Sequence, residues 1–265
     1  MLEIMDLHVR FHSRRHEAVG GISLTIHDGE ILGLVGESGS GKSVTAMSVA
    51  GLLPRRQCDY SGRIFLDGAE LLHADRADLR KMQGRDIGVV FQEPMSAMDP
   101  LMKIGDQVEE TLRIHTDLTA GERRARAVAA LRDVELPEPE KICGSYPHEL
   151  SGGMLQRVMI AAAIVSHPKL LLLDEPTTAL DVTIQAQILE LLRKLNGEYG
   201  MSMLFISHNL KVVHRLCGRV AVMQKGLLVE EGDTDHVFHH PESDYTRRLI
   251  AAIPTRTRKE EPDSE

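Results

Sequence analysis

The stretch ILGLVGESGSGKS, residues 31–43, joins an apolar run to a glycine-rich loop and precedes a helical pattern at residues 44–53. Its last eight residues match GxxxxGK[ST]. In this motif the glycines allow successive backbone N–H groups to face phosphate oxygens, and the following helix adds its positive end. Because the run before the loop is apolar throughout, it predicts a strand buried on both faces of a parallel sheet. The stretch therefore predicts an α/β fold that binds a phosphorylated ligand.

The glycine-rich loop supplies most of the predicted nucleotide contacts. Lys42 would bring its charge to the β- and γ-phosphates of ATP, and the Ser43 hydroxyl would coordinate Mg²⁺. Glycine-rich turns also occur without phosphate, but the strand before this loop and the helix after it favour a phosphate site. The residues assigned to nucleotide binding here are Gly36, Glu37, Ser38, Gly39, Ser40, Gly41, Lys42, Ser43 and Val44.

Two candidate catalytic carboxylates follow the apolar run at residues 170–173. Asp174 and Glu175 would lie at the carboxyl end of a buried strand, which is where ligands bind in open α/β sheets. We expect Asp174 to hold the Mg²⁺ shell, and Glu175 to orient and deprotonate the attacking water. An acidic pair alone is more typical of a helix start or a solvated turn. The phosphate loop makes the catalytic interpretation the favoured one.

The rest of the chain alternates between apolar runs and helical patterns. Runs at residues 87–91, 203–206 and 220–223 resemble the strand before the loop, and this alternation predicts an α/β sheet. Shorter alternating patterns at residues 2–9 and 22–26 predict strands near the N-terminus. A helical pattern that follows Asp181 is predicted to close at Gly197.

Residues 93–165 interrupt this alternation, because they show helical segments and no β run. Thr119 and Glu122 have the spacing of a capping box at a helix start, and Leu136-Pro137 breaks the helix that follows. We therefore expect a helical subdomain inserted into the α/β core. Residues 255–265 are charged and contain proline, so they are predicted to be disordered.

Composition excludes several classes of function. The formal net charge is −8, aromatic residues make up 3% of the chain and tryptophan is absent, which argues against a nucleic-acid partner. The three cysteines, Cys58, Cys143 and Cys217, form no CxxC pair and are expected to be reduced thiols. No apolar stretch has the length of a membrane span, and the first residues do not resemble a signal peptide. Any work at a membrane is therefore expected to need partner subunits.

The sequence LSGGM at residues 150–154 resembles the signature of the ATP-binding-cassette (ABC) family. Gln92 resembles the glutamine of the family's Q-loop, Asp181 the acid of its D-loop, and His208 its switch histidine. Phe11 is the candidate for the aromatic side chain that stacks on adenine. The resemblance extends over nearly the whole chain.

This resemblance implies a P-loop, RecA-like ABC ATPase core with an N-terminal antiparallel β subdomain and an inserted α-helical subdomain. The core would span residues 1–92 and 166–235, with the helical subdomain and signature at 93–165 and a C-terminal helical segment and tail at 236–265. Two cassettes would pack head to tail, so that the signature of one meets the γ-phosphate held by the other. The implied signature residues are Ser151, Gly152, Gly153 and Met154; the implied catalytic residues are Glu175, His208, Gln92 and Lys42; and the implied Mg²⁺ ligands are Ser43, Gln92 and Asp174.

Three segments, residues 91–100, 174–182 and 240–249, resemble cassettes of dipeptide, oligopeptide and nickel importers. Leu155 and the lack of a long cysteine-containing C-terminal extension favour the nickel type weakly over the peptide type. Such importers imply two transmembrane permease subunits, an extracytoplasmic substrate-binding protein and a second cassette, with a heterodimer favoured and a homodimer possible. The chain would be a peripheral subunit at the cytoplasmic face of the plasma membrane, with ATP and Mg²⁺ as its cofactors.

Two alternatives within the family stay open. The chain could be a soluble ABC-type ATPase that is not coupled to transport, although the segment between Ser43 and Ser151 holds no long coiled coil. It could also be a cassette that binds ATP without hydrolysing it, which the presence of Glu175 and His208 disfavours. The remaining histidines are expected to be ordinary surface residues rather than nickel ligands: His8, His12, His16, His236, His239 and His240.

Overall fold

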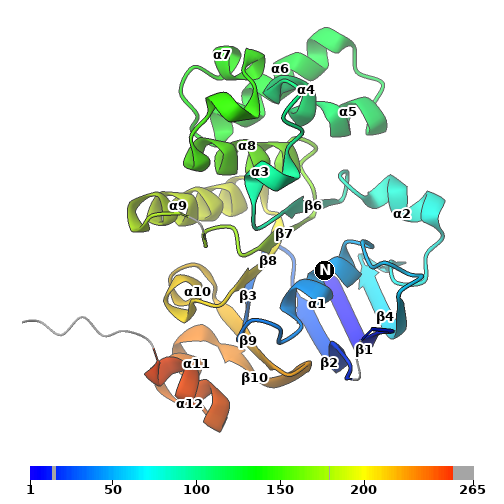
Figure 1. Ribbon diagram of the computed structural model, residues 1–265, viewed down its shortest axis with the longest axis vertical. Coiled ribbons are helices and arrows are strands. Elements are labelled where there is room, and N and C mark those ends of the chain that lie inside the picture. Colours follow the sequence, from blue (N-terminus) through cyan, green and yellow to red (C-terminus); the bar gives the residue numbers. More distant parts are fainter. Residues whose placement is uncertain (14–15, 179, 253–265) are drawn as a thin grey trace, which may run out of the picture.

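The computed structural model describes residues 1–13, 16–178 and 180–252. Ala179 and the tail predicted to be disordered at residues 255–265 lie outside this range. Two sheets and an inserted group of helices make up the described chain (Figure 1).

The larger sheet has six strands. It contains the buried strand at whose carboxyl end Asp174 and Glu175 were predicted to lie. Its order is β10 (Leu227–Asp233), β9 (Arg219–Gln224), β3 (Ile31–Val35), β8 (Ser202–Ser207), β7 (Leu170–Asp174) and β6 (Ile87–Val90). All neighbouring pairs are parallel except β9 and β10, which are antiparallel. Every residue of β3 and β8 is buried, as the uninterrupted apolar runs predict.

Alternate residues of these strands enter two different apolar cores. Leu32 and Leu34 of β3 pack with α1 (Lys42–Val49) and the smaller sheet, whereas Ile31 and Val35 pack with the helices of the opposite face. The smaller sheet is antiparallel, in the order β2 (Val19–Ile26), β1 (Leu2–Phe11), β4 (Cys58–Leu66) and β5 (Ala69–Glu70). The predicted N-terminal antiparallel subdomain is thus confirmed. Strands β4, β5 and β10 were not predicted.

The inserted region is helical, as predicted, and lies beside the β6 and β7 edge of the larger sheet (Figure 1). The predicted capping box is present, since the Thr119 side chain accepts from the Glu122 N–H and the Glu122 carboxylate accepts from the Thr119 N–H. The elements after β6 are α3 (Pro94–Ala97), α4 (Ile104–Val108), α5 (Glu110–His115), α6 (Ala120–Asp133), α7 (Pro139–Gly144), the 3₁₀ turn η1 (Pro147–Glu149) and α8 (Gly152–Ile164). A short helix, α2 (Arg76–Met82), precedes β6.

Two predicted helices had wrong bounds. Helix α9 (Val182–Tyr199) continues through Gly197 and is closed by Gly200, whose φ of 64° is left-handed. Glycine inside a helix costs only about 1 kcal/mol, so packing of the apolar face carries the helix past it. Helix α1 begins at Lys42 and ends at Val49, instead of spanning residues 44–53. The C-terminal helices are α10 (Leu210–Leu216), α11 (Thr234–His239) and α12 (Asp244–Ala251).

Candidate active site

The glycine-rich loop connects β3 to α1, and two of its glycines are required by close backbone contacts. Gly36 has φ 153°, and a Cβ at this position would lie 2.1 Å from the carbonyl oxygen of Met223. Gly41 has φ 112°, and its Cβ would lie 2.4 Å from the carbonyl oxygen of Ala18. Both obstacles are main-chain atoms, which cannot rotate away. The loop therefore keeps its curvature only with glycine at these positions.

Lys42 is buried inside this loop. Its Nζ donates hydrogen bonds to the carbonyl oxygens of Gly36, at 2.8 Å, and of Glu37, at 2.9 Å. Burial lowers the pKa of the Lys42 ammonium, and the nearby charges of Glu175 and Asp174 oppose that shift. An ammonium shielded from water beside inward-facing N–H groups is suited to binding phosphate oxygens.

A cavity of about 680 Å³ opens above the loop and has the size of a small-molecule site. Its lining brings together most of the residues predicted from the sequence. The described residues that line it are Ala18, Gly36, Glu37, Ser38, Gly39, Gly41, Lys42, Ser43, Val44, Gln92, Glu175, Thr178, His208 and Leu249. Ser40 is buried in the loop behind this surface, with its Oγ 3.4 Å from the Lys42 Nζ.

The two predicted Mg²⁺ ligands nearest the loop are in contact. The Ser43 hydroxyl donates a hydrogen bond of 3.0 Å to Oδ1 of Asp174. Burial raises the pKa of the Asp174 carboxyl, the bond from Ser43 opposes this, and the charge of Glu175 raises it further. A buried carboxylate whose negative charge is not fully neutralised by its neighbours is a suitable ligand for a cation. Mg²⁺ in particular prefers oxygen ligands.

Three side chains contact one carboxylate oxygen of Glu175, Oε2. It accepts from Nε2 of Gln92 at 3.3 Å and from Oγ1 of Thr178 at 2.9 Å. Nδ1 of His208 lies 3.0 Å from the same oxygen. Gln92, Glu175 and His208 come shortly after β6, β7 and β8, which are neighbours in the parallel sheet. The carboxyl ends of three adjacent strands thus bring these residues together, as the sequence predicts.

The backbone of Glu175 is unusual as well. Its φ of 48° lies in the left-handed region, which residues other than glycine and asparagine rarely adopt. Strained positions of this kind concentrate at functional sites, where the surrounding structure holds them. This feature supports a specific role for the Glu175 carboxylate.

The signature residues do not join this cavity in the described chain. Ser151 caps α8 by accepting from the Met154 N–H, and Ser151 and Gly152 are exposed to solvent. None of Ser151, Gly152, Gly153 and Met154 is among the described residues that line the cavity. Asp181 caps α9 by accepting from the N–H groups of Thr183 and Ile184, each at 2.9 Å. The head-to-tail pairing that would bring the signature to a nucleotide stays a prediction.

Phe11 is also outside the described cavity lining. It is half-buried at the end of β1, where its register partner is Cys58 of β4. Its stacking on adenine therefore stays a prediction.

Sequence reasoning assigned no role to two side chains that contact the site, although both lie in segments that resemble importer cassettes, residues 174–182 and 240–249. The Tyr245 hydroxyl, at the start of α12, accepts a hydrogen bond of 3.0 Å from the Glu37 N–H in the loop. Thr178 donates to Glu175, as described above. Leu249, one turn after Tyr245, lines the cavity. The resemblance of residues 240–249 singles out this segment but not the contact with the loop, because Tyr245 and Glu37 are 208 residues apart in the chain.

Among the described residues, none of the helices has the length and apolar character needed to span a membrane.

Known proteins share this fold and sequence. The ABC transporter family matches residues 19–178. The peptidoglycan transport ATP-binding protein YejF of Agrobacterium fabrum is 50% identical over 257 residues, which cover 96% of this chain and 47% of YejF. The oligopeptide transport ATP-binding protein OppD of Bacillus subtilis is 44% identical, with 96% of this chain and 72% of OppD covered. The chain therefore spans about half the length of YejF and more of OppD.

A solved structure agrees in fold. The dimeric post-hydrolysis state of the ATP-binding cassette MJ0796, bound to ADP and Pi, superposes with a TM-score of 0.78 at 29% identity. The superposition covers 88% of this chain and 99% of that one.

Proposed function

Since the chain belongs to the ABC transporter family, we propose that it hydrolyses ATP to drive the import of peptides through separate membrane subunits. The observation that carries the catalytic part is the set of contacts at Oε2 of Glu175, beside the loop that holds Lys42. The names of YejF and OppD, which state peptidoglycan and oligopeptide transport, support the peptide cargo. The nickel alternative stays a prediction.

The chain's own residues divide the chemistry of hydrolysis among them. The loop N–H groups and Lys42 bind the phosphates and stabilise the charge that develops on the γ-phosphoryl group. Glu175 orients the attacking water and accepts its proton. His208, at 3.0 Å from that carboxylate, positions Glu175 and the γ-phosphate relative to each other.

The oxygen atoms of Ser43, Asp174 and Gln92 would hold Mg²⁺ with the nucleotide. The raised pKa of Asp174 and its hydrogen bond from Ser43 fit this donor set. When bound, the cation neutralises phosphate charge and orients the phosphate oxygens.

A second cassette would complete the site. Exposure of Ser151 and Gly152 at the start of α8 supports this, because their N–H groups are available to phosphate on another chain. We favour a heterodimer with a homologous cassette, with a homodimer as the alternative.

Exposed apolar side chains support docking to permease subunits. Phe91, Met95 and Leu101 are large and exposed, and they lie where β6 leads into the helical region. A cavity of about 370 Å³, lined in part by Phe91 and Met98, opens beside them. A surface of this kind marks an interaction site. The chain would thus lie at the cytoplasmic face of the plasma membrane, with an extracytoplasmic binding protein reaching it only through two permeases.

Steady-state ATP turnover with Mg²⁺ tests the catalytic assignment. We expect Glu175→Gln to lower turnover by about 10²- to 10⁴-fold, the usual contribution of a general base, while ATP binding is retained. A wild-type chain as inert as this variant would contradict the assignment. Turnover that rises when permeases and peptide-loaded binding protein are added to vesicles would support transport over a cassette working alone, and turnover indifferent to them would oppose it.

A further inference from the structure

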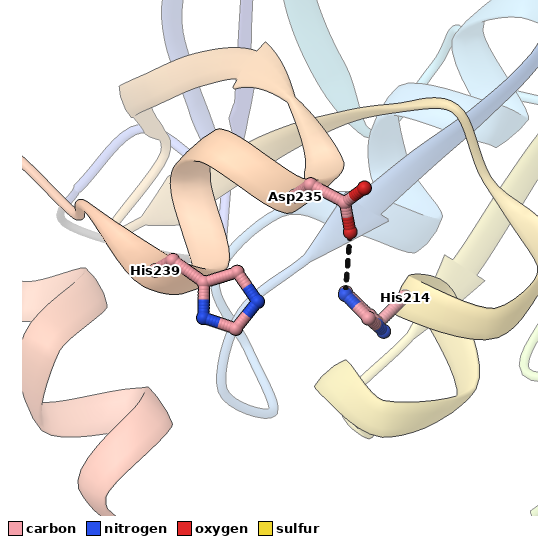
Figure 2. Close-up of side chains that lie close together, drawn as sticks. All are labelled: His214, Asp235 and His239. Carbon is pink, nitrogen blue, oxygen red and sulfur yellow. Dashed lines mark ion pairs between the residues drawn. The ribbon is translucent and has the colours of Figure 1, made fainter.

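Three metal-ligating side chains gather outside the active site, between α10 and α11. His214 belongs to α10, whereas Asp235 and His239 are four positions apart on α11 and so share one face of it. One ligand atom from each lies within 4.8 Å of the other two. Figure 2 shows the three side chains converging on the space between the two helices.

The closest contact in this group is not an ordinary hydrogen bond. Nε2 of His214 lies 2.8 Å from Oδ1 of Asp235, and this nitrogen is shielded from solvent. Yet no described residue makes a hydrogen bond to it with adequate alignment. His214 Nε2 is thus buried without an aligned hydrogen-bond partner, and a cation held between the three side chains would supply a partner for its lone pair.

The surroundings hold the His214 ring in place. The His214 ring packs against Phe238, with centroids 4.4 Å apart, and meets the His239 ring edge-on at 6.2 Å and 89°. His214 is partly buried and is therefore the fixed ligand, whereas Asp235 and His239 are exposed and can adjust. A metal bound by all three side chains needs bonds of about 2.0–2.1 Å to each ligand atom, and rotation of the exposed His239 ring can bring its nitrogen toward the other two ligands.

We propose that His214, Asp235 and His239 bind a divalent transition-metal ion of the class of Zn²⁺, Co²⁺ and Ni²⁺. Imidazole nitrogens are the preferred protein ligands of these ions, and two imidazoles with one carboxylate form a known three-ligand set. Water would occupy the remaining positions. The ion would cross-link α10, which begins two residues after His208, to the C-terminal α11.

Isothermal titration of the tag-free full chain with Zn²⁺ tests this proposal, with excess Mg²⁺ present to occupy the oxygen site of Ser43 and Asp174. We expect one equivalent bound by the wild type, and at least about tenfold weaker binding for His239→Ala or Asp235→Asn. The matched control is His236→Ala, which removes a histidine of the same helix from outside the cluster. It should bind Zn²⁺ as the wild type does.

A second readout uses Co²⁺, whose visible absorption reports its ligands. The wild type and His236→Ala should give the same spectrum and the same rise in unfolding temperature, and His239→Ala should give neither. Lack of Zn²⁺ binding by the wild type would overturn the proposal and leave an ion pair only. Equal weakening by His236→Ala and His239→Ala would overturn it too, because the ion would then lie elsewhere on α11.

Discussion

The bond between Tyr245 and the phosphate loop predicts that a residue far along the chain tunes ATP affinity. Tyr245→Phe keeps the buried ring and removes only the hydroxyl that accepts from the Glu37 N–H at 3.0 Å. A hydrogen bond of this kind contributes about 1 kcal/mol net, and the loss of an acceptor by this partly buried N–H costs about 1–2 kcal/mol. Because the N–H belongs to the loop that must curve around the phosphates, we expect about 1 kcal/mol of the loss to fall on ATP binding and the remainder on the stability of the free chain.

The expected change is a rise in the dissociation constant for ATP of about five- to tenfold, since 1.4 kcal/mol corresponds to a factor of ten. Turnover at saturating ATP should change little, because the Tyr245 hydroxyl bonds to the loop backbone and not to the Glu175 carboxylate. ATP affinity is best measured by titration in a Glu175→Gln background, where hydrolysis does not consume the ligand.

Tyr199→Phe is the matched control. The Tyr199 hydroxyl donates to Oδ2 of Asp133 at 2.7 Å, and neither residue lines the nucleotide cavity. Both variants should lower the unfolding temperature by about 2–4 °C for each kcal/mol lost, but only Tyr245→Phe should weaken ATP binding. Unchanged ATP affinity in Tyr245→Phe, or equal weakening in both variants, would refute the reasoning.

Three further predictions follow from local geometry. Gly41→Ala should destabilise the fold by about 2 kcal/mol or more and abolish nucleotide binding, because its Cβ would meet the Ala18 carbonyl oxygen. Gly39 has open space around it, so Gly39→Ala should lose less stability in thermal unfolding and less affinity in ATP titration. Burial raises the pKa of the Asp174 carboxyl in the folded chain above its ordinary value, so its ionisation opposes folding. This penalty is complete above the folded pKa, shrinks as pH falls below it, and is gone below the unfolded pKa. Without Mg²⁺, Asp174→Asn should therefore unfold at a higher temperature than the wild type at neutral pH but not in acid, and a difference independent of pH would contradict this. Burial raises the pKa of the three thiols, Cys58, Cys143 and Cys217, so a thiol reagent should label them slowly in the native chain and fully after denaturation.

The sheet could be predicted where burial leaves a strong pattern. The runs that became β3, β7 and β8 are apolar throughout, because helices or the second sheet cover both faces of those strands. Strand β10 lies at the edge of the sheet and is mostly half-exposed, so its sequence carries no such pattern. Strand β4 was missed for a related reason, since polar residues and Gly62, at φ 96°, interrupt its alternation.

Only the site residues that belong to short sequence motifs could be predicted. The loop, the acidic pair and His208 follow strands directly, so strand order alone brings them together. The bond from Tyr245 and the left-handed backbone of Glu175 depend on how distant segments pack, and no local signal records that.

The three contacts on Oε2 of Glu175 also suggest how the site could be linked to the helical region. A water that Glu175 activates can bind the other carboxylate oxygen, Oε1, because the contacts of these three side chains are all made to Oε2. Gln92 makes the longest of these contacts, at 3.3 Å, compared with 2.9 Å for Thr178 and 3.0 Å for His208. It is also the partner that precedes the helical region, since α3 begins two residues later. Gln92 is therefore the partner at the longest distance from the Glu175 carboxylate, and it joins that carboxylate directly to the start of the helical region.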